Sequence, residues 1–295
     1  MSGSPQTNLS ATGVEPGDAA IVVRNLTKTY DDNVVLNDLT FTLERGKVYV
    51  VMGPSGCGKS TLLRQLIGAE TPDAGQVSIG GVDMHSPDRK VRDEARRKFG
   101  VLFQSSALLN GLTVAENVAL PIQRHTDLPQ STIDLMVRLK LELVGMGAAS
   151  DKYPYEISGG MKKRAGLARA IALDPAIVFY DEPSAGLDPV MIGVIDKLIM
   201  DLTNKLGITS VVITHEMPSM FRIADEVLML YNGRFVFRGT PDQLRRSTDP
   251  LVRQFLNGDP EGPINAPRQL AELSDRLLGG SRRAGSGDGL KGAGA

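Results

Sequence analysis

The stretch GPSGCGKST, residues 53–61, decides the fold of this chain of 295 residues. It fits the pattern G-x-x-x-x-G-K-[ST], whose glycines allow a tight turn with several backbone N–H groups pointing into one anion-sized nest. In this pattern the ammonium of Lys59 reaches the β- and γ-phosphates of a nucleotide, and the hydroxyl of Ser60 ligates Mg²⁺. The predicted phosphate-binding loop consists of Gly53, Pro54, Ser55, Gly56, Cys57, Gly58, Lys59, Ser60 and Thr61.

The sequence on both sides of the loop supplies the setting that this pattern needs. Residues 47–52 predict a buried strand, and an apolar face over residues 62–67 predicts a helix that begins near Lys59. The positive end of that helix would lie beneath the phosphates, where it would also favour a thiolate at Cys57. A plain glycine-rich turn before a helix is the alternative, and the strand–loop–helix context disfavours it. We therefore predict that the chain binds a nucleoside triphosphate.

Composition excludes several other classes of protein. The chain has 33 basic and 34 acidic residues, which gives no overall sign of nucleic-acid binding. Charges of both signs crowd residues 86–98, and this mixture favours a solvated helix face over a nucleic-acid patch. No apolar run reaches the roughly 18 residues that a membrane span needs, and we find no signal-peptide pattern. The single cysteine excludes an internal disulfide and suits a reducing cytosol, so a membrane role would require a partner.

Two carboxylates end a second predicted strand, residues 177–180. Asp181 would lie beside the phosphates and hold Mg²⁺ through water, while Glu182 would accept a proton from the attacking water. A solvated acidic edge is the alternative, which a preceding phosphate loop makes weaker. His215 follows the predicted strand 210–214 and could contact the γ-phosphate or the attacking water, because open α/β sheets place ligands at the carboxyl ends of strands. The remaining histidines are assigned structural roles.

Three weaker signals complete the predicted site. Gln104 follows the strand-like run 100–103 and could touch Mg²⁺ or water. Tyr30 could stack on adenine, and a core tyrosine is nearly as well supported. The segment ISGGM, residues 157–161, opens a predicted helix through Leu173, and its Ser158, Gly159 and Gly160 form a second anion site at a helix N-terminus. Two phosphate sites about a hundred residues apart make sense if one subunit closes on the nucleotide held by another.

Local patterns outline the rest of the chain. Residues 105–165 are predicted to be mainly helical, with Ser131 capping a helix over 131–144 whose apolar stripe packs in its own subdomain rather than on a partner helix. Asn232-Gly233 predicts a β-hairpin, and Thr240 with Gln243 predicts a capping box. We expect a flexible leader at 1–19 and a disordered tail at 281–295.

The ordered set Tyr30, GPSGCGKST, Gln104, ISGGM, IVFYDEP, SAGLD and His215 resembles the ATPase subunit of ATP-binding-cassette (ABC) transporters. The resemblance covers residues 20–250 and implies an α/β fold: a RecA-like P-loop NTPase core with an antiparallel β subdomain and an inserted helical subdomain near 105–165. It also implies a homodimer that sandwiches two ATP molecules, each with Mg²⁺.

The same resemblance implies roles for particular residues. Tyr30 would stack on adenine, and Gln104 would sense the permease. Ser158, Gly159 and Gly160 would contact the γ-phosphate bound by the partner subunit. Asp188 would couple the two sites across the dimer, and His215 would be the switch histidine.

One departure from the general LSGGQ signature narrows the family. Ile157 and Met161 replace its leucine and glutamine, and Met161 lacks the amide of glutamine. SGGM followed by KKRA, the stretch ARAIALDP at 168–175, SAGLDP, and VRQFLNGDPEGP at 252–263 resemble the ATPase of Mla/Mce-type lipid transporters. This resemblance implies phospholipid transport between the inner and outer membranes and a peripheral location at the cytoplasmic face of the inner membrane.

In that family the ATPase works with an inner-membrane permease, a substrate-binding protein of the Mce type and, in some systems, a small regulatory subunit, and not with nucleic acid. Residues 251–280 would then be a C-terminal extension that contacts the dimer partner. Two alternatives stay open: the ATPase of another ABC exporter or nutrient importer, and a soluble ABC ATPase acting on DNA or ribosomes.

Overall fold

The computed structural model describes residues 19–264. The predicted leader up to residue 18, the predicted tail at 281–295 and the part of the extension from 265 to 280 lie outside the described residues. The chain divides into two compact units, residues 1–246 and 247–295. The first unit carries both sheets, and each unit is described by itself.

A six-stranded sheet forms the centre of the first unit, in the order β10-β9-β3-β8-β7-β6. Five strands run parallel and β10 pairs antiparallel with β9. All five residues of both β3 and β8 are buried, as expected for parallel strands covered on both faces. The strands are β3 (Val48–Met52), β6 (Phe99–Leu102), β7 (Ile177–Asp181), β8 (Thr209–Ile213), β9 (Glu226–Tyr231) and β10 (Arg234–Gly239).

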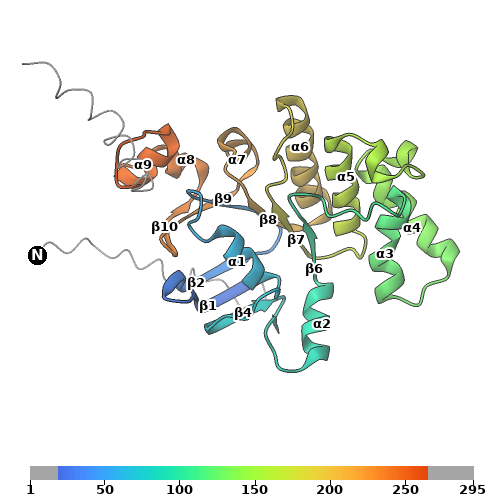
Figure 1. Cartoon of the computed structure of the whole chain (residues 1–295), viewed down its shortest axis with the longest axis horizontal. Helices are drawn as coiled ribbons and strands as arrows, with labels where there is room; N and C mark the ends of the chain where they lie inside the picture. The colour runs from blue at the N-terminus through green and yellow to red at the C-terminus, as the bar shows by residue number, and fades with distance from the viewer. Residues whose placement is uncertain (1–18, 265–295) are drawn as a thin grey trace, which may run out of the picture. The chain divides into compact units, whose positions relative to one another are not determined.

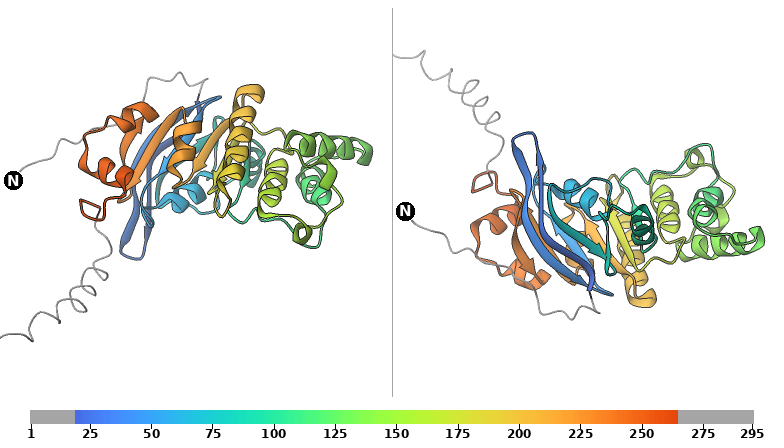
Figure 2. Two further views of the ribbon diagram at one scale, coloured as in Figure 1. Left: turned by 90° about the horizontal axis from the view of Figure 1, so that it is seen from above. Right: turned by 90° about the horizontal axis from the view of Figure 1, so that it is seen from below.

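A second, antiparallel sheet has the order β2-β1-β4-β5. One cluster of buried side chains, with Leu36, Leu62 and Phe179 among its members, joins this sheet to helix α1 and to one face of the six-stranded sheet. Figure 2 shows the blue strands β1 and β2 curving beside β9 and β10. The elements are β1 (Ala19–Tyr30), β2 (Asn33–Glu44), β4 (Ala74–Ile79), β5 (Val82–Asp83) and α1 (Lys59–Leu66).

A helical subdomain is inserted between β6 and β7. Its helices α3 (Val114–His125), α4 (Gln130–Leu143) and α5 (Gly159–Ala170) contact one another and gather on one side of the sheet (Figure 1). A full capping box between Thr113 and Glu116 starts α3, and the buried amide of Asn117 donates to three carbonyls of the preceding loop. The fold is therefore the predicted α/β core with an antiparallel β subdomain and an inserted helical subdomain.

The remaining helices cover the sheet or follow it. In the first unit they are α2 (Arg89–Arg97), α6 (Pro189–Leu206), α7 (Met217–Ile223) and α8 (Pro241–Arg245), and short 3₁₀ turns span Gly147–Ala149 and Pro154–Glu156. The second unit contains α9 (Pro250–Asn257), where the side chain of Gln254 hydrogen-bonds the backbone of Asp259 and Ile264. No helix within residues 19–264 is both long and apolar enough to cross a membrane.

Several local predictions are confirmed and two are wrong. The hairpin β9–β10 turns at Asn232-Gly233 with φ positive at both residues, and Thr240 forms its capping box with Gln243. The apolar stripe of α4 is buried in its own subdomain at Ile133, Val137 and Leu141. Ser131, however, does not cap α4. The helix begins one residue earlier, behind Pro129, whose fixed φ suits a helix start, and α5 ends at Ala170 rather than at Leu173.

Candidate active site

The predicted catalytic side chains follow the carboxyl ends of neighbouring strands in the six-stranded sheet. Strands β3, β8 and β7 are neighbours and parallel, and their pairing register aligns Val51 with Ile213 and Ile213 with Asp181. The phosphate loop follows β3, Glu182 follows β7, and Thr214 and His215 follow β8. This shared edge is where parallel α/β sheets bind ligands.

The phosphate loop is held close to its neighbours by glycines. Gly53 has φ 148°, and a Cβ there would lie 2.1 Å from the carbonyl oxygen of Leu230 in β9. A Cβ on Gly58, φ 106°, would lie 2.9 Å from the carbonyl oxygen of Val35 in β2. Gly58 is also the N-cap of α1 and provides no side-chain acceptor, so the first-turn N–H groups stay available for an anion. The loop therefore has the shape and donor set of a phosphate cradle.

The side chain of Lys59 folds back across this loop. Its ammonium donates to the carbonyl oxygens of Gly53, at 2.7 Å, and Pro54, at 2.8 Å. The positive charge is thus fixed at the loop itself rather than projecting into solvent. Ser60 and Thr61 lie in the first turn of α1, and the Ser60 side chain is exposed.

Cys57 differs from the sequence-based expectation of a favoured thiolate. The residue is only 8% exposed and belongs to the buried hydrophobic cluster. Burial raises the pKa of the thiol, and the ammonium of Lys59, 3.8 Å from Sγ, only partly opposes this effect. Inside the core the neutral thiol is the favoured form, so the expectation was wrong.

Two carboxylates stand at the end of β7 in different environments. Burial is the main cause that raises the pKa of Asp181, and the neighbouring Glu182 adds to it, while Lys163 and Arg64 oppose. The backbone of Glu182 has φ 47°, in the left-handed region that non-glycine residues rarely adopt. Its N–H donates to the carbonyl of Ile213 in β8 at 2.9 Å, which fixes where the side chain starts.

Glu182 and His215 form a direct pair. His215 Nδ1 lies 2.9 Å from Glu182 Oε1, within hydrogen-bond distance. Glu182 Oε2 is buried and has no hydrogen-bond partner within residues 19–264. A buried carboxylate oxygen without a donor is costly, so this atom is suited to accept a proton-bearing ligand such as water. The sequence assigned a role to each residue but gave no sign of this contact.

Tyr30 and Gln104 both lie at the surface of the first unit. Tyr30 ends β1 with 39% exposure, and its hydroxyl hydrogen-bonds the carboxylate of Glu70, so it is not a core tyrosine. Gln104 follows β6 and is exposed, and its side chain makes no hydrogen bond within the described residues. Its carbonyl accepts from the ammonium of Lys163 at 2.5 Å.

The predicted second anion site does not lie at the phosphate loop of its own chain. Ser158 is the N-cap of α5, its hydroxyl accepts from the Met161 N–H at 3.3 Å, and Ser158 and Gly159 are exposed. Helix α5 packs beside β6, whereas the loop follows β3, and strands β8 and β7 lie between them. Three strand spacings separate β3 from β6 by about 14 Å. Within the described residues, the two predicted anion sites are therefore not joined by a single chain.

Asp188 has a clear local role. It is the N-cap of α6, and one carboxylate oxygen accepts from the N–H groups of Val190, at 3.0 Å, and Met191, at 3.1 Å. Met191 in turn packs against residues 157–161, here called the signature turn. A Cβ on Gly160 would lie 2.6 Å from the terminal methyl carbon of Met191. Asp188 therefore begins the helix against which the second anion site packs.

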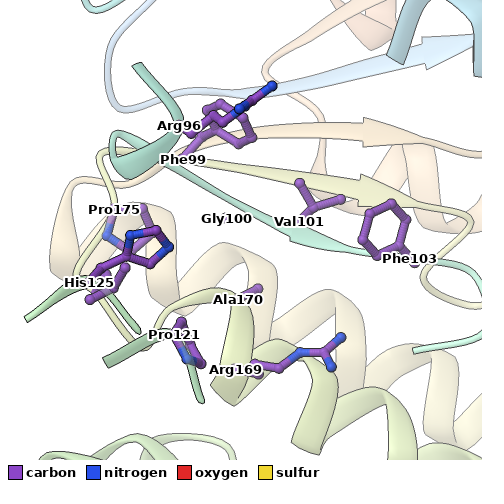
Figure 3. Close-up of a pocket in the computed structure, with 11 residues that line it drawn as sticks. Arg96, Phe99, Gly100, Val101, Phe103, Pro121, His125, Arg169, Ala170 and Pro175 are labelled. Atoms are coloured by element: carbon purple, nitrogen blue, oxygen red, sulfur yellow. The ribbon is translucent and has the colours of Figure 1, made fainter. Parts of the chain in front are cut away.

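Sequence reasoning missed two features of this region. One is the buried Lys163, which contacts the backbone of both Gln104 and Glu182. The other is a pocket of about 290 Å³ lined by Val101 and Phe103 from the β6 side and by Arg169 and Ala170 from α5 (Figure 3). The residues that line it span positions 96 to 175, so no local sequence pattern predicts it.

Known proteins are similar to this chain in sequence. The family model described as ABC transporter matches residues 36–185. The intermembrane phospholipid transport system ATP-binding protein MlaF of Escherichia coli K12 is 39% identical over 259 residues, which cover 88% of this chain and 96% of that protein. The probable ribonucleotide transport ATP-binding protein mkl of Mycobacterium tuberculosis H37Rv is 40% identical over 281 residues, covering 94% of this chain and 78% of that protein.

Solved structures share the fold. The ATP-binding cassette MJ0796, solved as a dimer in a post-hydrolysis state bound to ADP and Pi, has a TM-score of 0.69 at 28% identity and covers 75% of this chain and 98% of its own. The cbiO1 protein of Clostridium perfringens, part of the ABC transporter complex cbiONQ, has a TM-score of 0.72 at 26% identity and covers 88% of this chain and 99% of its own.

Proposed function

This chain belongs to the ABC transporter family as an ATP-binding ATPase subunit, and on that premise we propose that it powers phospholipid transport between the inner and outer membranes by closing as an ATP-sandwich dimer. The observation that carries the proposal is the sheet edge that brings together the Lys59 loop and the Glu182–His215 pair while leaving Ser158 elsewhere. Each chain thereby offers two half-sites, which a head-to-tail homodimer would join.

Each residue of the half-site has a distinct task in hydrolysis. The N–H nest and Lys59 hold the phosphates, and Glu182 Oε2 accepts the proton of the attacking water while His215 holds the other carboxylate oxygen. Tyr30 offers a surface ring for the adenine, and Asp188 starts the helix that would couple the two sites. Phosphoryl transfer needs this kind of positioning more than covalent chemistry.

The donor set also fits a magnesium ion. Within residues 19–264 no three His, Cys, Asp or Glu side chains converge into a metal cluster. Mg²⁺ characteristically takes one or two protein oxygens together with phosphate oxygens and waters. Ser60, Asp181 and Gln104 are the residues that would hold it, and the bound ion would neutralise charge on the phosphates.

The relatives carry two cargo names, phospholipid for MlaF and ribonucleotide for mkl. The SGGM signature at 158–161 and the segment 252–263, which resemble Mla/Mce-type lipid transporters, favour the phospholipid cargo. We infer an inner-membrane permease, a substrate-binding protein of the Mce type and a small regulatory subunit as its partners. The chain would then act peripherally at the cytoplasmic face of the inner membrane.

The pocket lined by Phe103, the residue before Gln104, is the surface that we assign to the permease. Phe103, Arg169 and His125 line it, so it offers apolar and cationic groups to a short amphipathic segment (Figure 3). Because Phe103 directly precedes Gln104, a segment seated there would press on the loop that carries Gln104. Residues 251–280, of which the structure describes 251–264, are proposed to contact the partner subunit.

Reconstitution tests the cargo. The chain is co-purified with its permease partner, placed in liposomes, and supplied with ATP and a fluorescent phospholipid or a labelled ribonucleotide. We expect ATP-dependent movement of the phospholipid, and none when the chain carries Glu182→Gln. ATP-dependent movement of the ribonucleotide and not of the phospholipid would contradict the proposed cargo.

A further inference from the structure

Lys163 lies in the second turn of α5 and is only 4% exposed. Its ammonium donates to two backbone carbonyls, that of Gln104 at 2.5 Å and that of Glu182 at 3.0 Å. These carbonyls belong to two loops at neighbouring strand ends, after β6 and after β7. One buried side chain therefore ties both loops to the same helix.

A buried lysine is rare because its charge loses hydration. The carboxylates of Asp181 and Glu182 stabilise the charge of Lys163 and so partly offset this loss. The charge does not approach either carboxylate closely enough to form an ion pair, and the hydrogen bonds go to backbone oxygens instead. Because both acceptors are backbone oxygens, the hydrogen bonds fix the backbone at Gln104 and Glu182 and do not neutralise a carboxylate.

The backbone of Glu182 needs such fixing. Its φ of 47° costs energy for a non-glycine residue and persists only where the surroundings determine it. Its N–H is held by the carbonyl of Ile213, and its own carbonyl is held by Lys163. With both groups bound, the side chain starts from one defined point and meets His215 at 2.9 Å.

We propose that Lys163 is a positioning residue for hydrolysis, which holds the strained backbone of Glu182 and the Gln104 loop in register with each other. It acts through Glu182 and does not touch the nucleotide. The inference rests on the proposed role of Glu182 as the base, and it adds a residue of the signature helix to that task.

Lys163→Met tests the proposal, because methionine keeps the apolar stem, ends one atom short of the lysine ammonium and removes every donor. In the purified full chain we expect kcat for ATP hydrolysis to fall about ten- to a hundredfold, a part of what a positioned base contributes. ATP affinity, measured with a fluorescent ATP analogue, should change less than roughly threefold because the Lys59 nest is untouched. Lys162→Met is the matched control, since the Lys162 side chain has no hydrogen bond or ion pair within residues 19–264, and should keep kcat.

A double-mutant cycle separates positioning from a general structural effect. Single-turnover hydrolysis of radiolabelled ATP is measured for Glu182→Gln with and without Lys163→Met. If Lys163 acts through Glu182, the second substitution adds no further loss. The proposal is overturned by a full multiplicative loss in the Glu182→Gln background, or by normal kcat in Lys163→Met alone.

A folding defect would appear as lost nucleotide affinity and a lowered thermal midpoint. In that case Lys163→Gln, which is smaller and keeps an N–H donor, replaces the methionine variant in the same cycle. The outcomes also separate this inference from the proposed function. Normal kcat in the lysine variants with inactive Glu182→Gln refutes only the positioning role, whereas an active Glu182→Gln refutes the base itself.

Discussion

Glu182 adopts a left-handed backbone directly after a strand of extended residues, and three neighbours hold it there. Ile213 accepts its N–H, Lys163 donates to its carbonyl, and His215 binds one carboxylate oxygen. Strain of this kind typically costs on the order of 1–3 kcal/mol and tends to occur where function requires one orientation. The residue that the sequence predicts to be the base is thus held at its N–H, its carbonyl and its carboxylate.

Cys57 gives a prediction at the same scale. Because burial raises the pKa of its thiol, a smaller fraction is thiolate at any given pH than in the unfolded chain. The thiolate is the reactive form, so the rate of N-ethylmaleimide labelling should reach half its maximum at a higher pH in the folded protein than in urea. The chain has one cysteine, so the label reports this site alone. A midpoint at the same pH or lower in the folded protein would contradict the buried environment.

At the scale of elements, the turn of the hairpin β9–β10 packs closely against strand β2 of the other sheet. Gly233 has φ 72°, and a Cβ there would lie 2.7 Å from the carbonyl oxygen of Val35 in β2. Gly207, the C-cap of α6, has a similar φ of 68° but open space around the same position. A substitution at Gly207 therefore meets backbone strain alone, whereas a substitution at Gly233 meets backbone strain and a steric contact.

Gly207→Ala should lower the free energy of unfolding by about 1–2 kcal/mol, the cost of a left-handed alanine. Gly233→Ala should cost more, because the added methyl must also displace the backbone of β2. Urea unfolding of both variants, followed by circular dichroism, measures the difference. Equal losses would mean that β2 gives way without cost and that the contact does not matter.

The elements that the sequence predicts well are those with local signals. Asn232-Gly233 and the Thr240 capping box need only a few adjacent residues, and the strand before the phosphate loop is a continuous apolar run. Contacts between distant residues left no such signal. The Glu182–His215 pair joins residues 33 positions apart, and Lys163 joins loops 59 and 19 positions away. The thiolate at Cys57 was mispredicted because burial raises the pKa of the thiol more than Lys59 lowers it. The start of α4 was mispredicted because Pro129, and not Ser131, precedes the first turn.

At the scale of the whole molecule, the topology keeps the phosphate loop apart from the start of helix α5. The loop after β3 and the signature turn of α5 are separated by two strands of the same sheet. The MJ0796 cassette, which shares this fold, was solved as a dimer bound to ADP and Pi. Joining the halves would bury the exposed Ser158 and Gly159 against a second chain and make nucleotide the contact between subunits.

The central claim is that ATP joins two copies of this chain, and light scattering during size-exclusion chromatography tests it most directly. The variant Glu182→Gln is used so that bound ATP is not hydrolysed. With saturating Mg²⁺ and ATP we predict that the mass rises from the 31.6 kDa of one chain to twice that value, and that adding Ser158→Arg returns it to one chain. A mass of one chain for Glu182→Gln at saturating ATP would contradict the account.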